Sequence, residues 1–340
     1  MQQPRNTRSV KDLFAGFDTT IRHYVVDRPR ARIETIRRQF ANLPQTNFRV
    51  GCDFAARGLW MDAAFRFRVA TYLKPDYTQA YYNLGCARAQ LNQPEAAIAA
   101  FAQALKLKPD YEEARFMLSG LQPTSTPPRT MPRAMVRGFF ESVAVEYDAL
   151  AEASEYQGPR LVVEAAKPYL TKRQALQMLD LGCGTGLVAR PWRALCQSIL
   201  GIDLVPAMVA QAERARAGDN PVYDRVLTAD ILELPAGTVP AGSMDIVLCC
   251  DTAQFLGDLT STLKLAAAVL APGGLFILTV EPHQAPQGYA VNRATARFGH
   301  HPDYARKLAA PLGLELKRDG RVPLYADRAA QLYVFMKKAP

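Results

Sequence analysis

The chain has 340 residues, of which 49% are hydrophobic, enough for a sizeable core and for one to three domains. No apolar run reaches the roughly 18 residues of a membrane-spanning helix, and the first residues lack the apolar core of a signal peptide. The six cysteines form no C-x-x-C pair, which argues against a zinc site or a disulfide framework. We therefore expect a cytoplasmic protein with no bound metal and no membrane contact.

The net charge of +9 comes from the front of the chain. Residues 1–133 hold 20 Lys and Arg against 11 Asp and Glu, whereas residues 134–340 hold 21 of each kind. A basic arm can bind nucleic acid. The aromatic residues of this region do not alternate with the arginines as a nucleic-acid platform requires. We interpret the charge as a solvated helical surface and do not expect nucleic-acid binding.

Two copies of the word KPDY, at residues 74–77 and 108–111, stand 34 residues apart. This period is that of the tetratricopeptide (TPR) repeat, a helical hairpin. Residues 44–77 and 78–111 are the two predicted repeats, with small residues where helices cross, aromatic residues between hairpins and a closing proline. The positions that fit are Gly51, Phe54, Ala63, Phe67, Ala70 and Pro75, then Tyr81, Leu84, Gly85, Ala97, Phe101, Ala104 and Pro109.

Further helices are predicted on both sides of the repeats. One over residues 30–43 caps the array, and one over residues 112–121 begins a third repeat, so that an all-α TPR domain covers residues 1–121. So short an array is marginal by itself. We expect it to bind a protein partner or to mediate self-association. Residues 122–133 are rich in proline and threonine and are predicted to be a linker.

The second half opens with helices predicted over residues 134–150 and 159–169, followed by a buried strand at 178–181. A glycine-rich turn, a helix interrupted by Pro191 and a second strand ending at Asp203 come next. Such a unit binds nucleosides, because glycines let the backbone approach the ligand and the acid accepts bonds from ribose hydroxyls. Two glycine patterns compete: D-x-G-x-G-x-G from Asp180 to Gly186, and G-x-G-x-x-A from Gly184 to Ala189, the dinucleotide pattern. We favour the first, since Gly182 directly follows the strand.

Acidic residues end the next strands as well. A strand over residues 224–229 runs into Asp230, and one over residues 244–250 runs into Asp251. The carboxyl ends of the strands are where a doubly wound sheet binds its ligand. The remaining predictions are a helix over 259–270, a strand over 275–280, an irregular stretch over 282–301, a helix over 304–312 and closing strands over 314–317 and 331–336.

From residue 135 onwards the chain resembles bacterial TPR-containing class I S-adenosylmethionine (SAM) methyltransferases. The words that carry the resemblance are LDLGCGTGLV, GIDLVPAMV, DTAQFLGDL and LAPGGLFILTVE. The resemblance implies an α/β, Rossmann-like domain over residues 134–340, with a seven-stranded sheet whose last strand is reversed, behind the all-α TPR domain. It also implies that SAM is the cofactor.

The resemblance further implies which residues bind SAM. Asp203 would bind the ribose hydroxyls, Asp230 the adenine amino group, and Tyr147 or Tyr156 would cover the cofactor. The implied cofactor-binding set is Asp180, Gly182, Cys183, Gly184, Gly186, Asp203, Leu204, Met208, Asp230, Ile231 and Asp251. A base is needed only when the acceptor arrives protonated. His300 and His283, in the irregular stretch, are the candidates.

Three hypotheses about function stay open at this point. The first is a SAM-dependent methyltransferase acting on an unidentified small molecule or protein. The second is a non-catalytic TPR adaptor whose second domain binds SAM without turnover. The third is a nicotinamide-dependent oxidoreductase, based on the dinucleotide pattern from Gly184 to Ala189.

Overall fold

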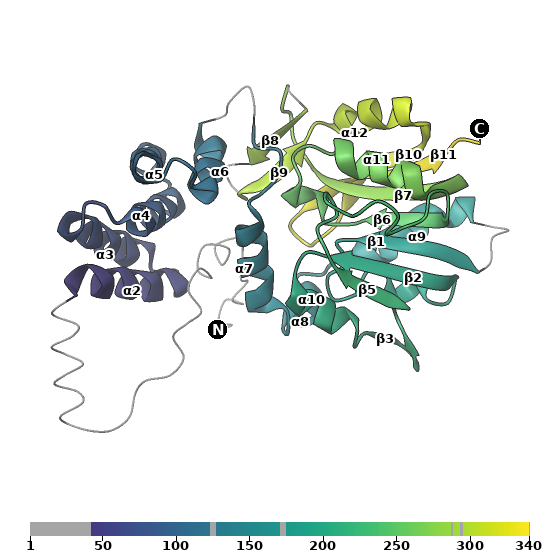
Figure 1. The fold of residues 1–340 in the computed structure, drawn as a ribbon, viewed down its shortest axis with the longest axis horizontal. Coiled ribbons are helices and arrows are strands. Elements are labelled where there is room, and N and C mark those ends of the chain that lie inside the picture. Colours follow the sequence, from purple (N-terminus) through teal and green to yellow (C-terminus); the bar gives the residue numbers. More distant parts are fainter. Residues whose placement is uncertain (1–41, 123–126, 171–174, 287, 293–294, 340) are drawn as a thin grey trace, which may run out of the picture. The chain divides into compact units, whose positions relative to one another are not determined.

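The computed structural model describes residues 42–122, 127–170, 175–286, 288–292 and 295–339, and they form two compact units. The first holds residues 42–122 with Thr295 and Ala296, and the second holds the other described residues (Figure 1). None of the helices described in either unit is long and apolar enough to cross a membrane. The domain boundaries at residues 121 and 134 stay a prediction. The capping helix predicted over residues 30–43 falls almost wholly outside the described residues.

Along residues 43–121 the first unit is a series of helices, as the repeats predict. They are α2 (Leu43–Ala56), α3 (Trp60–Leu73), α4 (Thr78–Gln90), α5 (Pro94–Leu107) and α6 (Glu112–Leu121). Each packs against the next one in the chain. The hairpins α2–α3 and α4–α5 correspond to the two predicted repeats, and α6 is the additional helix.

The two hairpins pack in the same way, because equivalent residues stand 34 positions apart. A Cβ atom on Gly51 would lie 2.6 Å from Cε1 of Phe67, and one on Gly85 would lie 2.6 Å from Cε1 of Phe101. Both rings are buried, and a close-packed interior leaves them no room to move aside. Both helix crossings therefore require glycine.

The KPDY words also have the same structure in both copies. The Nζ atom of Lys74 lies 5.1 Å from the centre of the Tyr77 ring, and that of Lys108 lies 5.1 Å from the centre of the Tyr111 ring. This is a cation–π contact. The helix before each word ends one residue ahead of the lysine, so the word closes the hairpin.

The second unit is built on one sheet, whose main path runs β10–β11–β7–β6–β1–β2–β5 (Figure 1). The strands are β1 (Leu176–Leu181), β2 (Cys196–Asp203), β5 (Arg225–Thr228), β6 (Met244–Cys249), β7 (Leu270–Pro282), β10 (Leu314–Pro323) and β11 (Ala329–Lys337). The strands from β5 to β7 are parallel, whereas β11 is antiparallel to both its neighbours. The predicted sheet with a reversed last strand is confirmed.

Short strands add to this path. β8 (Tyr289–Asn292) pairs with β9 (Arg297–His300), which runs parallel to the end of β7, where Glu281 pairs with Gly299. The stretch predicted to be irregular over residues 282–301 is therefore partly strand. A separate small hairpin joins β3 (Arg216–Ala217) to β4 (Asn220–Pro221).

The helices of the second unit differ from the prediction in two places. They are α7 (Arg133–Val143), α8 (Tyr147–Ala153), α9 (Gly158–Ala166), α10 (Pro206–Ala212), α11 (Thr260–Val269) and α12 (Pro302–Ala309). The single helix predicted over residues 134–150 is broken between α7 and α8. The α-helix predicted after the glycine turn is wrong, because only the 3₁₀ turn η3 (Arg190–Trp192) forms there. Pro191 cannot donate a helical bond, and the buried Trp192 anchors the short connection.

The core lies on both faces of the sheet. Successive residues of β1 point to opposite faces, so that Met178 packs in one apolar cluster and Leu179 and Leu181 in the other. Strands buried on both faces are typical of parallel sheets. The strands β1, β2 and β6 are therefore packed on both faces, and the edge where they end carries the predicted site.

Candidate functional site

The predicted cofactor-binding residues gather at the carboxyl edge of the sheet. The glycine turn follows β1, Asp203 ends β2, Asp230 follows β5 and Asp251 follows β6. These strands are neighbours and parallel, so their ends meet at one edge, where such sheets bind ligands. Their side chains nevertheless have different partners.

The glycine turn after β1 has a backbone that few other residues could adopt. Gly182, Gly184 and Gly186 have φ values of +74°, +54° and +95°, which favour glycine. A Cβ atom on Gly182 would lie 2.3 Å from Oγ1 of Thr252, so the turn is packed against the residue after Asp251. Among the residues that the structure describes, none comes within 4 Å of a Cβ atom built on Gly184, apart from its chain neighbours. The turn is thus tightly packed against Thr252 at Gly182 and has open space beside Gly184.

Asp203 holds this turn in place. Its Oδ2 atom accepts a hydrogen bond of 2.8 Å from the backbone N–H of Gly184, and its Oδ1 atom accepts one of 2.9 Å from that of Val205. Burial raises the pKa of the carboxyl group, and the backbone bonds oppose this effect. Asp203, at the end of β2, is therefore hydrogen-bonded directly to Gly184, the glycine with open space beside it.

Asp180, two residues before Gly182, is bonded to a side chain, and its role in cofactor binding stays a prediction. The side chain is 2% exposed, and Oδ2 accepts a hydrogen bond of 2.8 Å from the Tyr223 hydroxyl. Burial raises the pKa of Asp180 to about 7, although the bond from Tyr223 acts in the opposite direction. Cys183 is also buried and packs near Tyr223. The contacts of Asp180 indicate that it supports the turn.

Helix α8 is tied to the turn by Asp148. Oδ1 of Asp148 accepts a hydrogen bond of 2.5 Å from the Thr185 hydroxyl, and Oδ2 lies 3.3 Å from a guanidinium nitrogen of Arg190. The sequence patterns gave no reason to select Asp148. The residue fixes the start of α8, which carries Tyr147, against the glycine turn.

Asp230 and Ile231 follow β5. Oδ1 of Asp230 accepts a hydrogen bond of 2.8 Å from the backbone N–H of Leu232, and Oδ2 lies 2.6 Å from Nε of Arg133. Arg133 also pairs with Glu233. Asp230 thus links the loop after β5 to the first residue of α7, and Ile231 is half-buried beside it.

Leu204 and Met208 lie in an apolar cluster formed with α7. Met208 is 1% exposed. The cluster consists of Ala144, Val205 and Met208, with Phe140, Val143, Tyr147, Leu204 and Ala207 packed against it. The helix before the sheet therefore covers the start of α10, and Tyr147 joins this apolar side to the polar residues around Asp251.

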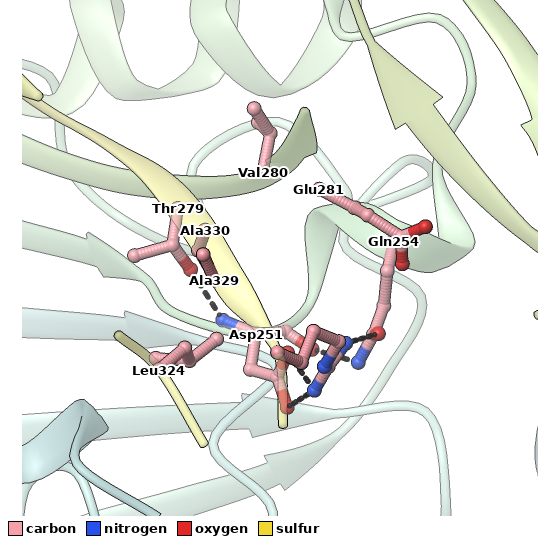
Figure 2. A pocket seen from close by; sticks show the side chains of 9 residues that line it. Asp251, Gln254, Thr279, Val280, Glu281, Leu324, Ala329 and Ala330 are labelled. Carbon is pink, nitrogen blue, oxygen red and sulfur yellow. Dashed lines mark hydrogen bonds and ion pairs between the residues drawn. The ribbon is translucent and has the colours of Figure 1, made fainter. Parts of the chain in front are cut away.

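Asp251 is the centre of a polar cluster that the sequence did not predict. Its φ of +56° is in the left-handed region, which is strained for a residue with a side chain. Its carboxylate accepts a bond of 2.6 Å from the Tyr325 hydroxyl and lies 3.1 Å and 3.3 Å from Nη2 of Arg328. Nη1 of Arg328 donates to Gln254 at 2.5 Å. Asp251, Gln254, Thr279, Glu281 and Arg328 line a small pocket here (Figure 2).

Two tyrosines from the segment before β1 cover this cluster: Tyr147 begins α8, and Tyr156 lies in the connection between α8 and α9. The Tyr156 ring stacks on that of Tyr325 with 4.8 Å between centres, and its hydroxyl lies 3.5 Å from Sγ of Cys250. Burial raises the pKa of Tyr147, and the nearby charge of Asp251 adds to the effect. Both candidate tyrosines therefore lie beside Asp251.

The two candidate histidines lie beyond the end of β7. His300 is fully buried, and its Nε2 atom lies 3.1 Å from the carbonyl oxygen of Gly257. Burial lowers the pKa of His300 to about 4, so the ring is neutral at pH 7. The backbone N–H of His283 donates to the carbonyl of His300 at 2.8 Å. Their catalytic role stays a prediction, and the burial of His300 argues for a packing role.

Comparison with known proteins agrees with this geometry. The family model of the methyltransferase domain matches residues 179–278, and that of the tetratricopeptide repeat matches residues 78–111. The first match begins in β1 and ends in β7, and so includes the glycine turn and the acids at the ends of β2, β5 and β6. These two segments of the chain are thus similar to a methyltransferase domain and to a TPR repeat.

Curated relatives align with parts of the chain. It is 29% identical over 150 residues to malonyl-(acyl-carrier protein) O-methyltransferase of Serratia marcescens, covering 44% of this chain and 54% of the relative. It is 35% identical over 106 residues to ubiquinone biosynthesis O-methyltransferase of Methylobacterium nodulans, covering 30% and 40%. The chain thus spans about half the length of the first relative and less than half the length of the second. The crystal structure of the 4+2 cyclase SpnF has the same fold, with a TM-score of 0.51 at 16% identity over 64% of this chain and 100% of that one.

Sequence reasoning missed residues that support the candidate site through distant contacts. They are Asp148, Tyr223, Thr252, Tyr325 and Arg328. Of these, only Thr252 belongs to one of the quoted words, DTAQFLGDL, in which Asp251 was the residue selected. The turn from Tyr325 to Arg328, between the two closing strands, could have indicated Tyr325 and Arg328 as site residues. Because the last strand is reversed, this turn lies at the carboxyl edge of the parallel strands.

Proposed function

We propose that the chain is a SAM-dependent methyltransferase that acts on a small molecule or a protein, with TPR helices that bind a protein partner or a second copy of the chain. The proposal is carried by one observation. The carboxylate of Asp203 binds the backbone of Gly184, the open glycine of the turn. A nucleoside placed over Gly184 would have its ribose beside that carboxylate.

The residues present fit SAM at this place. Each oxygen of Asp203 accepts one backbone bond, which leaves lone pairs for the two ribose hydroxyls. In the described part of the chain, the space around a Cβ on Gly184 is open to 4 Å beyond its chain neighbours, which is the space that the ligand needs. Leu204 and Ile231 are half-buried apolar residues that follow the acids of β2 and β5, where an adenine ring would lie. Oδ2 of Asp230, which pairs with Arg133, would also accept a hydrogen bond from the adenine amino group.

SAM, when bound, supplies an electrophilic methyl group on its sulfonium. The chain must then hold the acceptor in line with that methyl group and keep water out. Asp251 and the two tyrosines that cover it lie at the end of the strand next to β1, which is the place for the acceptor. His300 and His283 remain candidates for a base, and His300 would act as a neutral imidazole.

The order of the strands supports SAM over a nicotinamide cofactor. β11 is antiparallel to β7 and lies between β7 and β10, an arrangement typical of class I methyltransferases and absent from the dinucleotide dehydrogenases. The fold alone does not require methyl transfer, since a structure named a cyclase has it. The non-catalytic adaptor therefore remains the alternative, and turnover must separate the two. A cytoplasmic location stays a prediction.

Calorimetric titration of the full chain with SAM, and separately with NAD, tests the proposal. We expect micromolar SAM affinity and no response to NAD. Asp203→Ala should weaken SAM binding by about 100-fold, because two hydrogen bonds to a charged acceptor are lost. Asp219→Ala, at an exposed acid, is the matched control and should bind as the wild type does. A wild-type chain without SAM affinity contradicts the proposal.

Transfer of a labelled methyl group from SAM to cell-extract components decides between enzyme and adaptor. We expect labelled product with the wild-type chain and none with Asp203→Ala. Tight SAM binding without transfer to any fraction would favour the adaptor. Repeating the assay with residues 1–122 removed, which leaves Arg133 and its bond to Asp230 in place, asks whether the TPR helices deliver the acceptor.

A further inference from the structure

Helix α3, the second helix of the first hairpin (Figure 1), carries a row of exposed apolar side chains. Met61 is 71% exposed, Phe65 is 52% exposed and Tyr72 is 84% exposed. Residues three or four positions apart share one face of a helix, so these side chains and the exposed Arg68 form one row, the α3 stripe. Single exposed apolar residues are ordinary, whereas a contiguous group of large ones marks an interaction surface.

The fold of a TPR hairpin does not require this stripe. The second hairpin has the same internal packing as the first, as the helix crossings at Gly51 and Gly85 show. In α5, the residues 34 positions after those of the stripe are also exposed, and they are Glu95, Ala99, Ala102 and Lys106. Because α5 packs in its hairpin with charged and small residues at these positions, the large apolar side chains of α3 serve another purpose.

The order of residues in the α3 stripe suits a second copy of itself. In an antiparallel pair of α3 helices that share a centre, Met61 of one copy lies opposite Tyr72 of the other, and Phe65 lies opposite Arg68. A thioether against an aromatic ring and a guanidinium over an aromatic ring are both favourable contacts. Each contact occurs twice, because a two-fold axis exchanges the copies. A parallel pair in register would instead set Arg68 against Arg68.

The charges at the two ends of α3 favour the same arrangement. Arg57 stands three residues before α3 and Asp76 three residues after it, and both are exposed. Antiparallel helices bring the start of one beside the end of the other, so Arg57 of each copy would come near Asp76 of the other copy. A parallel pair would bring like charges together, which is unfavourable. The charges therefore select the antiparallel pair.

We propose that the α3 stripe is an interface between two copies of the chain, with α3 packed against α3 in an antiparallel pair. The inference rests on the proposed function, because it selects a second copy as the partner of the TPR helices, but it does not depend on methyl transfer. Met61 and Tyr72 are about 17 Å apart along the helix, at 1.5 Å per residue. One helix face of this length is smaller than the ~800 Å² that each partner buries in a standard interface. The dimer is therefore weak, with a dissociation constant of about 10 μM.

Analytical ultracentrifugation of the full chain, at concentrations from about 1 to 100 μM, tests the interface. We expect an equilibrium of monomer and dimer without larger species, since a two-fold interface closes on itself. Phe65→Glu should weaken the association about 100-fold, because it places an unpaired charge at the centre of the interface. Ala99→Glu adds the same charge at the equivalent exposed position of α5. This matched control should dimerise as the wild type does.

A charge exchange tests the antiparallel arrangement separately. Arg57→Asp alone and Asp76→Arg alone should each weaken the association about fivefold, because two attractive pairs in the dimer become repulsive. The double variant restores opposite charges and should recover the wild-type dissociation constant to within about twofold. Weakening in both single variants without recovery in the double variant would overturn the antiparallel pair.

Other outcomes would overturn the interface itself. They are a chain that stays monomeric at the highest concentration, a dimer that Phe65→Glu leaves intact, and an equal weakening by Ala99→Glu. A monomer whose free energy of unfolding falls in Phe65→Glu but not in Ala99→Glu would show that the chain covers its own stripe, which also contradicts the inference. Failure of the proposed function shows differently, as a lack of SAM affinity in calorimetry of the wild-type chain.

Discussion

The glycine turn and the Asp251 cluster lie at the same edge of the sheet but are built in different ways. Asp203 binds backbone N–H groups of Gly184 and Val205, which are 19 and 2 positions away. Asp251 binds side chains of Tyr325 and Arg328, which are 74 and 77 positions away. The first region depends on a short local pattern of glycines and an acid. The second depends on side chains that only the complete fold brings together.

This difference explains why one region can be identified from sequence and the other cannot. A backbone turn requires particular residue types at fixed spacing, because only glycine tolerates its φ values without strain. A side-chain cluster requires only that suitable residues meet, and their spacing in the chain is set by intervening elements. Variants in the two regions should therefore differ in what they change.

The largest effect is expected for Gly182→Ala. The new Cβ atom would lie 2.3 Å from Oγ1 of Thr252, at a φ of +74°. We expect a loss of about 3 kcal/mol in the free energy of unfolding, from strain and overpacking together. Denaturant unfolding measures this. Gly320→Ala is the control, since a Cβ atom there meets nothing within 4 Å; equal losses in both variants would contradict the account.

A smaller, pH-dependent effect is expected for Asp180→Asn. The pKa of Asp180 in the folded chain, about 7, exceeds the ordinary value of 3.8. As the pH rises, Asp180 therefore loses its proton at a lower pH in the unfolded chain than in the folded one. Wild-type stability should therefore fall as the pH rises from about 4 to 7, by about 2 kcal/mol between pH 5 and pH 8 from this group. Asparagine can still accept the Tyr223 bond but cannot ionise. Denaturant unfolding across that range should show a flatter profile for the variant, and parallel profiles would refute the effect.

The smallest effect is expected for Tyr325→Phe, in the Asp251 cluster. The variant loses the 2.6 Å bond to Asp251 but keeps the ring that stacks on Tyr156. We expect a loss of about 1 kcal/mol in stability and an unchanged affinity for SAM, measured by calorimetry. Tyr72→Phe, at a tyrosine that is 84% exposed, should change neither quantity. A large loss of SAM affinity in Tyr325→Phe would show that the two regions are one site.

The fold could be read largely from the sequence. The 34-residue period marks positions such as Gly51 and Gly85, whose side-chain space is taken by Phe67 and Phe101. The alternation of apolar runs with acids marks the strands and their carboxyl ends. Each of these features follows from local geometry, so that a single chain is enough to show it.

The errors arose where distant packing overrides local pattern. The α-helix expected after the glycine turn is replaced by a 3₁₀ turn, because Pro191 and the buried Trp192 fix a short connection. The polar pattern of residues 282–301 gave no sign that β9 would pair with the end of β7 and bury His300.

The central claim is that the open glycine and the acid bound to it hold the nucleoside of SAM. Amide NMR spectra of the full chain, titrated with S-adenosylhomocysteine, test it most directly. The account predicts saturable shifts of the Gly184 and Val205 signals, the two N–H groups that Asp203 binds, and no such shifts with NAD. Saturable binding of S-adenosylhomocysteine that does not shift the Gly184 and Val205 signals would contradict the claim.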